Sequence, residues 1–248
     1  MLPTPSPAIP SVSPSQMAAI DSFMTAALAL DILQIMELAG LAVARAAAAM
    51  LPASDPRGRA ILILAGRGGN GGDGLVAARL LAAWGALPTV VLSHPDDRLA
   101  PPAARNLASV RALGIPVFPL PADPASSPPL PPADLTIDAL LGFGLAGPPS
   151  GRSADLIHAA NAHPAPILAV DLPSGLDAAT GIPRDPCIRA TRTITLALPK
   201  TGLLAPAAIP VTGHITVGDI GIPAVAWASI GLDIPPLFGP SGLIDLHP

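Results

Sequence analysis

Short apolar runs alternate with helical segments along the middle of the chain. The predicted strands are the runs at 60–65, 89–92, 117–118, 135–140, 167–170 and 193–198. The predicted helices are 15–29, 31–50, 75–84, 102–113 and 153–162, with Asp31 placed to cap the second. Because the first run is apolar without alternation, we expect its strand to be buried on both faces. The alternation predicts an α/β fold with a mostly parallel sheet covered by helices on both faces.

Proline-rich segments set the expected limits of the domain. Residues 1–14 are rich in Pro and Ser and are predicted to form a disordered tail, followed by a single domain at 15–223. Residues 119–132 are a predicted surface loop within it. Residues 224–248 form a C-terminal extension whose packing the pattern leaves open.

Composition narrows the classes of partner. The formal net charge is -4, there is no basic cluster and no Tyr, so we expect no nucleic-acid partner. No apolar run reaches the roughly 18–20 residues of a membrane span, so none is predicted. The N-terminus lacks the pattern of a signal peptide, and the single cysteine, Cys187, suits a reducing compartment. We therefore expect a cytoplasmic protein.

A dense glycine run follows the first predicted strand. Residues 66–74 read GRGGNGGDG and precede a helix, so backbone N–H groups and the helix N-terminus could approach an anionic ligand. The alternative is a flexible loop without a ligand. Gly66, Gly68 and Gly71 match G-x-G-x-x-G, which is a weak signal alone. The acid expected on the second strand of a Rossmann domain is misplaced, and Asp73 stands where a P-loop needs Ser or Thr.

Charged residues follow three further predicted strands. Asp138 lies near the end of the fourth and precedes a second glycine-rich segment at 142–148; its alternative role is a cap or loop brace. Asp171 directly follows the fifth, so we expect a partly desolvated carboxylate, with a structural Asx-turn as the alternative. Lys200 follows the sixth, where a merely solvated lysine is equally compatible.

Three oxygen-bearing side chains are expected to converge on this edge. Asn70, Asp138 and Ser174 offer an amide, a carboxylate and a hydroxyl, which suit an alkali or alkaline-earth cation. With one carboxylate, a monovalent cation is the better match. The histidines lack metal spacing, and Ser174 is not in a G-x-S-x-G elbow, so a hydrolase triad is unsupported.

Four separated motifs carry a family resemblance. GNGGDGLVAARLL, IDALLGFGL, AVDLPSGLDAATG and LPKTGL, in this order and spacing, resemble the NAD(P)H-hydrate epimerases. Upstream, Gln16, Met17 and Asp21 and the segment MELAG look like the N-terminal helices of that family, and VGDIGIP resembles its closing segment. The resemblance spans about residues 13–225.

The resemblance implies a three-layer αβα Rossmann-like fold, a homodimer and interconversion of the R and S forms of hydrated NADH and NADPH. It implies a potassium ion held by Asn70, Asp138 and Ser174. The residues implied to contact the hydrated dinucleotide are Gly69, Asn70, Gly71, Gly72, Asp73, Gly142, Phe143, Gly144, Leu145, Ala146, Gly147, Pro148 and Asp171. The family usually has Asn where this chain has Gly69. An ATP- or ADP-dependent dehydratase, often fused in the family, is expected here as a separate protein.

Inverting the carbinolamine carbon requires a bond to that carbon to break and re-form on the opposite face. Either hydroxide leaves to give an iminium ion, or the ring opens to an aldehyde. Both routes need a positioned acid or base, for which Asp171 is the candidate and Lys200 a weaker one. The competing hypotheses are a non-catalytic dinucleotide-binding module and a conventional NAD-linked dehydrogenase.

Overall fold

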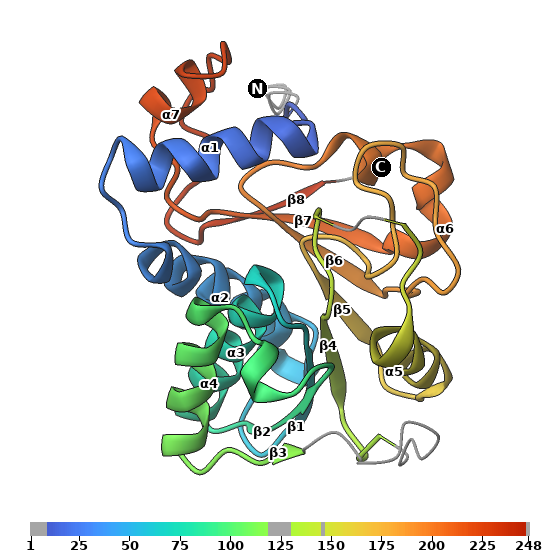
Figure 1. Cartoon of the computed structure of the whole chain (residues 1–248). Helices are drawn as coiled ribbons and strands as arrows, with labels where there is room; N and C mark the ends of the chain where they lie inside the picture. Colours follow the sequence, from blue (N-terminus) through green and yellow to red (C-terminus); the bar gives the residue numbers. More distant parts are fainter. Residues whose placement is uncertain (1–8, 119–129, 145–146, 247–248) are drawn as a thin grey trace.

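The computed structural model describes residues 9–118, 130–144 and 147–246, and its centre is one eight-stranded sheet (Figure 1). The strand order is β3-β2-β1-β4-β5-β6-β7-β8, and every neighbouring pair is parallel except β7 with β8. The strands are β1 Ala60–Ala65, β2 Leu87–Leu92, β3 Val117–Phe118, β4 Leu135–Ala139, β5 Ile167–Val170, β6 Arg192–Leu196, β7 His214–Gly218 and β8 Leu243–Leu246. The predicted α/β class with a mostly parallel sheet is confirmed.

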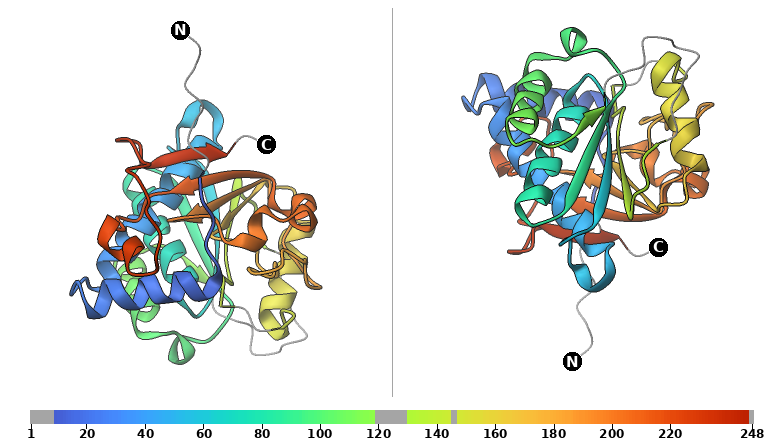
Figure 2. Two further views of the ribbon diagram at one scale, coloured as in Figure 1. Left: turned by 90° about the horizontal axis from the view of Figure 1, so that it is seen from above. Right: turned by 90° about the horizontal axis from the view of Figure 1, so that it is seen from below.

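Helices cover both faces of the sheet, which gives the expected three layers (Figures 1 and 2). The α-helices are α1 Pro14–Ala26, α2 Ile32–Ala49, α3 Gly69–Ala83, α4 Pro101–Ala112, α5 Gly151–Ala162, α6 Ile209–Thr212 and α7 Ala224–Ala228. Short 3-10 turns occur at Pro52–Ser54, Asp96–Arg98, Thr201–Leu204 and Pro206–Ala208. α2, α3 and α4 lie on one face, and α5 and α6 on the other.

Strand β1 shows why its sequence is continuously apolar. Ile61 and Ile63 belong to the core formed with α2, α3 and α4, whereas Leu62 and Leu64 pack with the core of α5. Successive side chains of a strand point to opposite faces, so a strand between two helical layers buries every residue. All four side chains are at most 1% exposed.

The glycine run is not a loop, which corrects the sequence expectation. α3 begins at Gly69, six residues before the predicted start, so most of the run forms its first turns. A Cβ on Gly71 would lie 1.9 Å from the carbonyl oxygen of Gly66, and a Cβ on Gly66 would lie 1.8 Å from that of Leu140. The absence of side chains therefore lets the helix pack directly against the ends of β1 and β4, and the flexible-loop alternative is wrong.

The structure extends the domain beyond the predicted limits at both ends. Val12 is fully buried and pairs with the Lys200 segment, its N–H donating to Pro199 (2.9 Å) and its carbonyl accepting from Thr201 (2.9 Å). Residues 9–13 are thus part of the fold, while 1–8 lie outside the described residues. At the other end α7 lies beside α1, and β8 adds an antiparallel edge strand (Figure 1). Most of the predicted loop at 119–132 lies outside the described residues.

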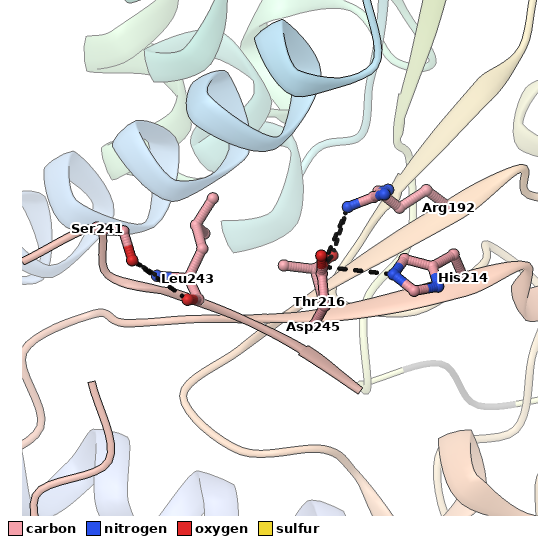
Figure 3. Close-up of polar contacts among 6 residues, drawn as sticks. All are labelled: Arg192, His214, Thr216, Ser241, Leu243 and Asp245. Atoms are coloured by element: carbon pink, nitrogen blue, oxygen red, sulfur yellow. Dashed lines mark hydrogen bonds and ion pairs between the residues drawn. The ribbon is translucent and has the colours of Figure 1, made fainter. Parts of the chain in front are cut away.

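The antiparallel edge strand is held by side chains of three strands. Asp245 of β8 accepts a hydrogen bond from Thr216 of β7 (2.6 Å) and pairs with Arg192 of β6 (3.1 Å) (Figure 3). The His214 ring nitrogen lies 3.5 Å from the same carboxylate. No part of this cluster was predicted, since its members are distant in sequence.

Within the described part of the chain, α2 is the one helix long and apolar enough to cross a membrane. Half of it is buried inside the protein, where it packs against α3 and the sheet. Asp31 caps it as predicted, accepting a hydrogen bond from the N–H of Leu33 (2.8 Å). Its apolar character is therefore explained by core packing.

Candidate functional site

The carboxyl ends of the parallel strands meet along one edge of the sheet. β1 pairs with β2 on one side and with β4 on the other, so the chain reverses its direction of progress across the sheet between β1 and β4. Ligands of open α/β sheets bind outside the carboxyl ends at such a point. The residues after β1, β4, β5 and β6 are the ones that the sequence singled out.

Asp138 and Ser174 are in direct contact there. The Asp138 carboxylate accepts hydrogen bonds from the Ser174 hydroxyl (2.6 Å), the Ser174 N–H (2.8 Å) and the Leu140 N–H (3.2 Å). The Ser174 hydroxyl oxygen also accepts from the N–H of Leu141 (2.9 Å). The predicted convergence of these two loops is confirmed, and Asp138 also acts as the loop brace named as its alternative.

The Asp138 side chain is completely buried, as is Ser174. Burial raises the pKa of Asp138 to about 6, against the lowering effect of its hydrogen bonds from Ser174 and Leu140. A cation bound beside this carboxyl group would favour its ionised form.

Asn70, in the first turn of α3, lies against the loop that follows β4. A Cβ built on Gly142 would be 3.5 Å from the Asn70 Cβ and 3.6 Å from its Oδ1. The Asn70 Nδ2 is buried and has no hydrogen-bond partner among the described residues. A buried amide nitrogen without a partner is uncommon in folded proteins, and it indicates a hydrogen-bond acceptor, such as a water or a ligand oxygen, that the described residues do not supply.

Asp171 and Lys200 form a buried ion pair beside this group. Lys200 is 1% exposed and Asp171 4%, and their side chains contact each other directly. The Lys200 ammonium also donates to the carbonyl of Leu196 (3.0 Å) and lies 5.6 Å from the centre of the Phe143 ring. The alternative of a merely solvated Lys200 is therefore wrong. The Asp171 carboxylate faces β6 and Lys200, whereas in an Asx-turn it would accept a hydrogen bond from the backbone that directly follows it.

The backbone of Asp171 adopts a left-handed conformation (φ +66°). Such φ values are uncommon for residues other than glycine and persist where the surrounding structure enforces them, often at functional sites. The Asp171 N–H donates to the Ile194 carbonyl (2.7 Å), which fixes the turn at the end of β5. Its carboxylate is thereby directed across the end of β6.

Two further acids complete the buried charge cluster. Asp73, from the second turn of α3, is 9% exposed, and burial raises its pKa well above the ordinary range, assisted by the charges of Asp171 and Asp21. Burial also raises the pKa of Asp21, on α1, to about 6. Sequence reasoning missed this role of Asp21. A signal existed, because Asp21 follows Met17 by four residues and shares its buried helix face.

The other residues predicted to contact the dinucleotide differ in their exposure. Gly69, Gly144, Gly147 and Pro148 are exposed, and Gly71 and Gly72 are buried. Leu145 and Ala146 lie outside the described residues. Among the described residues of 142–148, Gly142 and Phe143 contact the cluster.

A cavity of about 400 Å³ lies beside this edge, under the C-terminal extension. It is lined mainly by apolar residues, including Leu198, Trp227 and Phe238, with Asp219 as its one acid. None of Asn70, Asp138 or Ser174 lines it. Asp171 and Lys200, the residues expected to carry the chemistry, do not line this cavity either.

The donor set suits a monovalent cation. One carboxylate, one amide oxygen and one hydroxyl oxygen lie in adjacent loops, and hard oxygen ligands favour alkali and alkaline-earth ions. The described residues contain no group of three His, Cys, Asp or Glu side chains that could hold a metal ion. A transition-metal centre is therefore not indicated by this part of the chain.

Comparison with known proteins places the chain in a family. Residues 32–202 match the family model described as YjeF-related protein N-terminus. The crystal structure of yeast ynu0 superimposes with a TM-score of 0.78 over 96% of this chain and 100% of that chain, at 24% identity, which shows the shared fold.

Two relatives illustrate the contexts in which the domain occurs. An NAD(P)H-hydrate epimerase of Dehalogenimonas lykanthroporepellens is 40% identical over 82% of this chain and 78% of its own length. The bifunctional NAD(P)H-hydrate repair enzyme Nnr of Moorella thermoacetica is 37% identical over 86% of this chain, which spans 40% of that larger protein. The chain therefore belongs to the NAD(P)H-hydrate epimerase family, whose shared domain is the YjeF-related protein N-terminus.

Proposed function

We propose that this protein epimerises the R and S forms of hydrated NADH and NADPH, an isomerase reaction that repairs damaged nicotinamide nucleotides. The observation that carries the proposal is the buried Asp171–Lys200 pair next to the Asn70–Asp138–Ser174 group, at the edge of the sheet where ligands of this fold class bind. The relatives named as NAD(P)H-hydrate epimerases support it.

The N-terminus of α3 is suited to the dinucleotide phosphates. The first N–H groups of a helix lack intrahelical partners and carry partial positive charge, which favours phosphate. Gly68 and Gly69 have no atom within 4 Å of where a Cβ would stand, so the backbone there is open to a ligand. The nicotinamide end would then extend towards Asp171.

We assign proton transfer to Asp171 and charge stabilisation to Lys200. The Lys200 ammonium contacts the buried Asp171 carboxylate directly, and a carboxyl group held in a fixed position is what proton transfer at the ring carbon requires. A buried ion pair holds both side chains in place, because separating them would leave each charge buried without a partner.

Potassium is the cation we propose for Asn70, Asp138 and Ser174. It would give the Asn70 amide oxygen and the Asp138 carboxylate a shared positive partner, and so hold the loops after β1, β4 and β5 together. This chemistry is electrostatic and structural. We also propose a homodimer, a cytoplasmic location and metabolic coupling to a separate dehydratase. Light scattering tests the homodimer, and the assay below tests the coupling to a dehydratase.

The test is a coupled assay with purified R-hydrate of NADH and a dehydratase that accepts only the S form. We expect the nicotinamide absorbance to return only when this protein is added, and the rate to fall about 10²–10⁴-fold in Asp171→Asn. Asp97→Asn, on an exposed surface turn, is the matched control and should retain the wild-type rate. Binding of the hydrate without any turnover would favour the non-catalytic binding module instead.

A further inference from the structure

Four ionisable side chains from separate elements lie near one another behind the site; three of them are buried and Asp21 is half-buried. Asp21 comes from α1, Asp73 from α3, Asp171 from the end of β5 and Lys200 from the segment after β6. The last three are 9%, 4% and 1% exposed. Asp73 is within electrostatic range of the other three, and Asp21 is within range of Asp171 and Lys200.

One lysine cannot balance three carboxylates. Leaving two uncompensated negative charges in a buried region is costly, so such groups retain protons instead. Asp171 is the carboxylate in direct contact with Lys200. Burial first, and then the charges of Asp171 and Asp21, raise the pKa of Asp73 well above its usual range.

The charges that act on Asp73 are those of Asp171, Asp21 and Lys200. α2 and α3 also carry Glu37 and Arg79, but these pair with each other on the half-exposed side of the helices. α4 presents the uncharged Asn106, whose amide donates to the Gly72 carbonyl (3.4 Å). The environment of Asp73 is therefore set by Asp21, Asp171 and Lys200.

Asp73 is also directed towards the substrate region. It follows Asn70 by three residues on α3, and residues at that spacing lie on the same helix face. Asn70 contacts the Gly142 loop at the rim of the sheet. The same face thus carries an unpartnered amide at the rim and a carboxyl group one turn deeper.

We propose that Asp73 and Asp171 work as an acid–base pair: Asp73 protonates the departing hydroxyl, and Asp171 accepts a proton from the water that replaces it. The proposal rests on the proposed function and deepens it. The two carboxyl groups have different environments, since Asp171 is in an ion pair with Lys200 and Asp73 is buried near other acids, and such a difference is what an acid–base pair requires.

The step is balanced as follows. The Asp73 proton goes to the carbinolamine hydroxyl, the carbon–oxygen bond breaks with its electron pair on oxygen, and water leaves while the ring nitrogen lone pair forms the iminium bond. Solvent water then bonds to the same carbon from the opposite face, the nitrogen regains its lone pair, and the water proton goes to Asp171. Asp73 is left ionised and Asp171 protonated, which is the state needed for the reverse inversion.

The first variant is Asp73→Asn. We expect kcat to fall about 10²–10⁴-fold and the Tm at about pH 8 to be equal to or above that of the wild type, because an amide matches a protonated carboxyl in size and charge. Asp97→Asn again serves as the control. A kcat within about threefold of wild type overturns the proposal.

Two further measurements cover a variant that folds poorly. Asp21→Asn removes one of the negative charges that favour the proton on Asp73, so the alkaline limb of the kcat/KM profile should move to lower pH; an unchanged limb overturns the proposal. The infrared spectrum of the wild type at about pH 7 should contain a protonated-carboxyl band that Asp73→Asn lacks. This band needs no turnover, so an inactive wild type would defeat the proposed function while the protonation of Asp73 is still tested.

Discussion

At the scale of single residues, the clearest departure from the family pattern is Gly69. It is exposed at the first position of α3, its φ is not positive, and a Cβ there would meet no atom within 4 Å. The backbone therefore accepts a side chain at this position without rearrangement. Packing therefore does not explain why this chain lacks the Asn that is usual in the family.

We predict that Gly69→Asn tightens substrate binding. One added hydrogen bond contributes about 0.5–1.5 kcal/mol, so KM for the hydrate should fall roughly 2–10-fold with kcat little changed. Gly69→Ala is the control, because it adds the Cβ without the amide. Equal KM values for Asn and Ala would show that the amide makes no contact with the substrate.

At the scale of elements, α1 adds a half-buried acid, Asp21, to the charged cluster. Asp21 has its pKa raised from 3.8 to about 6, chiefly by burial. Between these values the folded protein holds a proton that the unfolded chain has released, so the stabilisation present below about pH 4 is lost as the pH rises through about 6.

Asp21→Asn should therefore stabilise the protein at alkaline pH. A shift of about two pKa units corresponds to roughly 1–3 kcal/mol in the free energy of unfolding at about pH 8, and the difference should vanish near pH 4. Urea unfolding at the two pH values measures it. An equal difference in the free energy of unfolding at both pH values would mean that Asp21 acts through packing alone.

The edge strand β8 depends on its one carboxylate. Asp245 pairs with Arg192 and accepts from Thr216, but the group is partly exposed, so Asp245→Asn should cost less than about 1 kcal/mol globally. We expect faster amide hydrogen exchange confined to β7 and β8. Asp233→Asn, on the exposed part of the extension, should leave exchange unchanged, and protection equal to wild type in both variants would contradict the role of Asp245.

At the scale of the whole molecule, a cation shared by three loops should stabilise the complete fold. A ligand that binds only the folded state at 100 times its Kd adds about 2.7 kcal/mol, or a rise of several degrees in Tm for a domain of this size. We predict this rise in potassium chloride relative to N-methylglucamine chloride at equal ionic strength.

Asn70→Ala is the matched variant for this measurement. It removes one proposed ligand oxygen, while the buried Nδ2 has no hydrogen-bond partner to lose within the described residues. The potassium-dependent part of the Tm should decrease sharply, with little change in its absence. A full potassium response in Asn70→Ala would remove Asn70 from the ligand set.

Local pattern predicted the strands from β1 to β6 and the helices from α1 to α5, but it missed β7, β8, α6 and α7. β1, β3 and β5 have the predicted bounds, and the strand-end positions of Asp138, Asp171 and Lys200 followed from the topology of parallel sheets. The start of α3 was mistaken because glycine disfavours helix, and only the close approach of Gly71 to Gly66 explains why glycine is nevertheless required.

The amino-acid sequence by itself determined the α/β class, the family and which residues would stand at one edge of the sheet, because periodicity and motif spacing are properties of the chain. Tertiary structure decided which residues meet there. Lys200 is buried against Asp171, Val12 pairs with the Lys200 segment, and Asp21 of α1 lies within electrostatic range of both charges. The physical reason is that charge balance depends on distance in space. Helix α1 comes within range of β5 and β6 only after the intervening chain has folded.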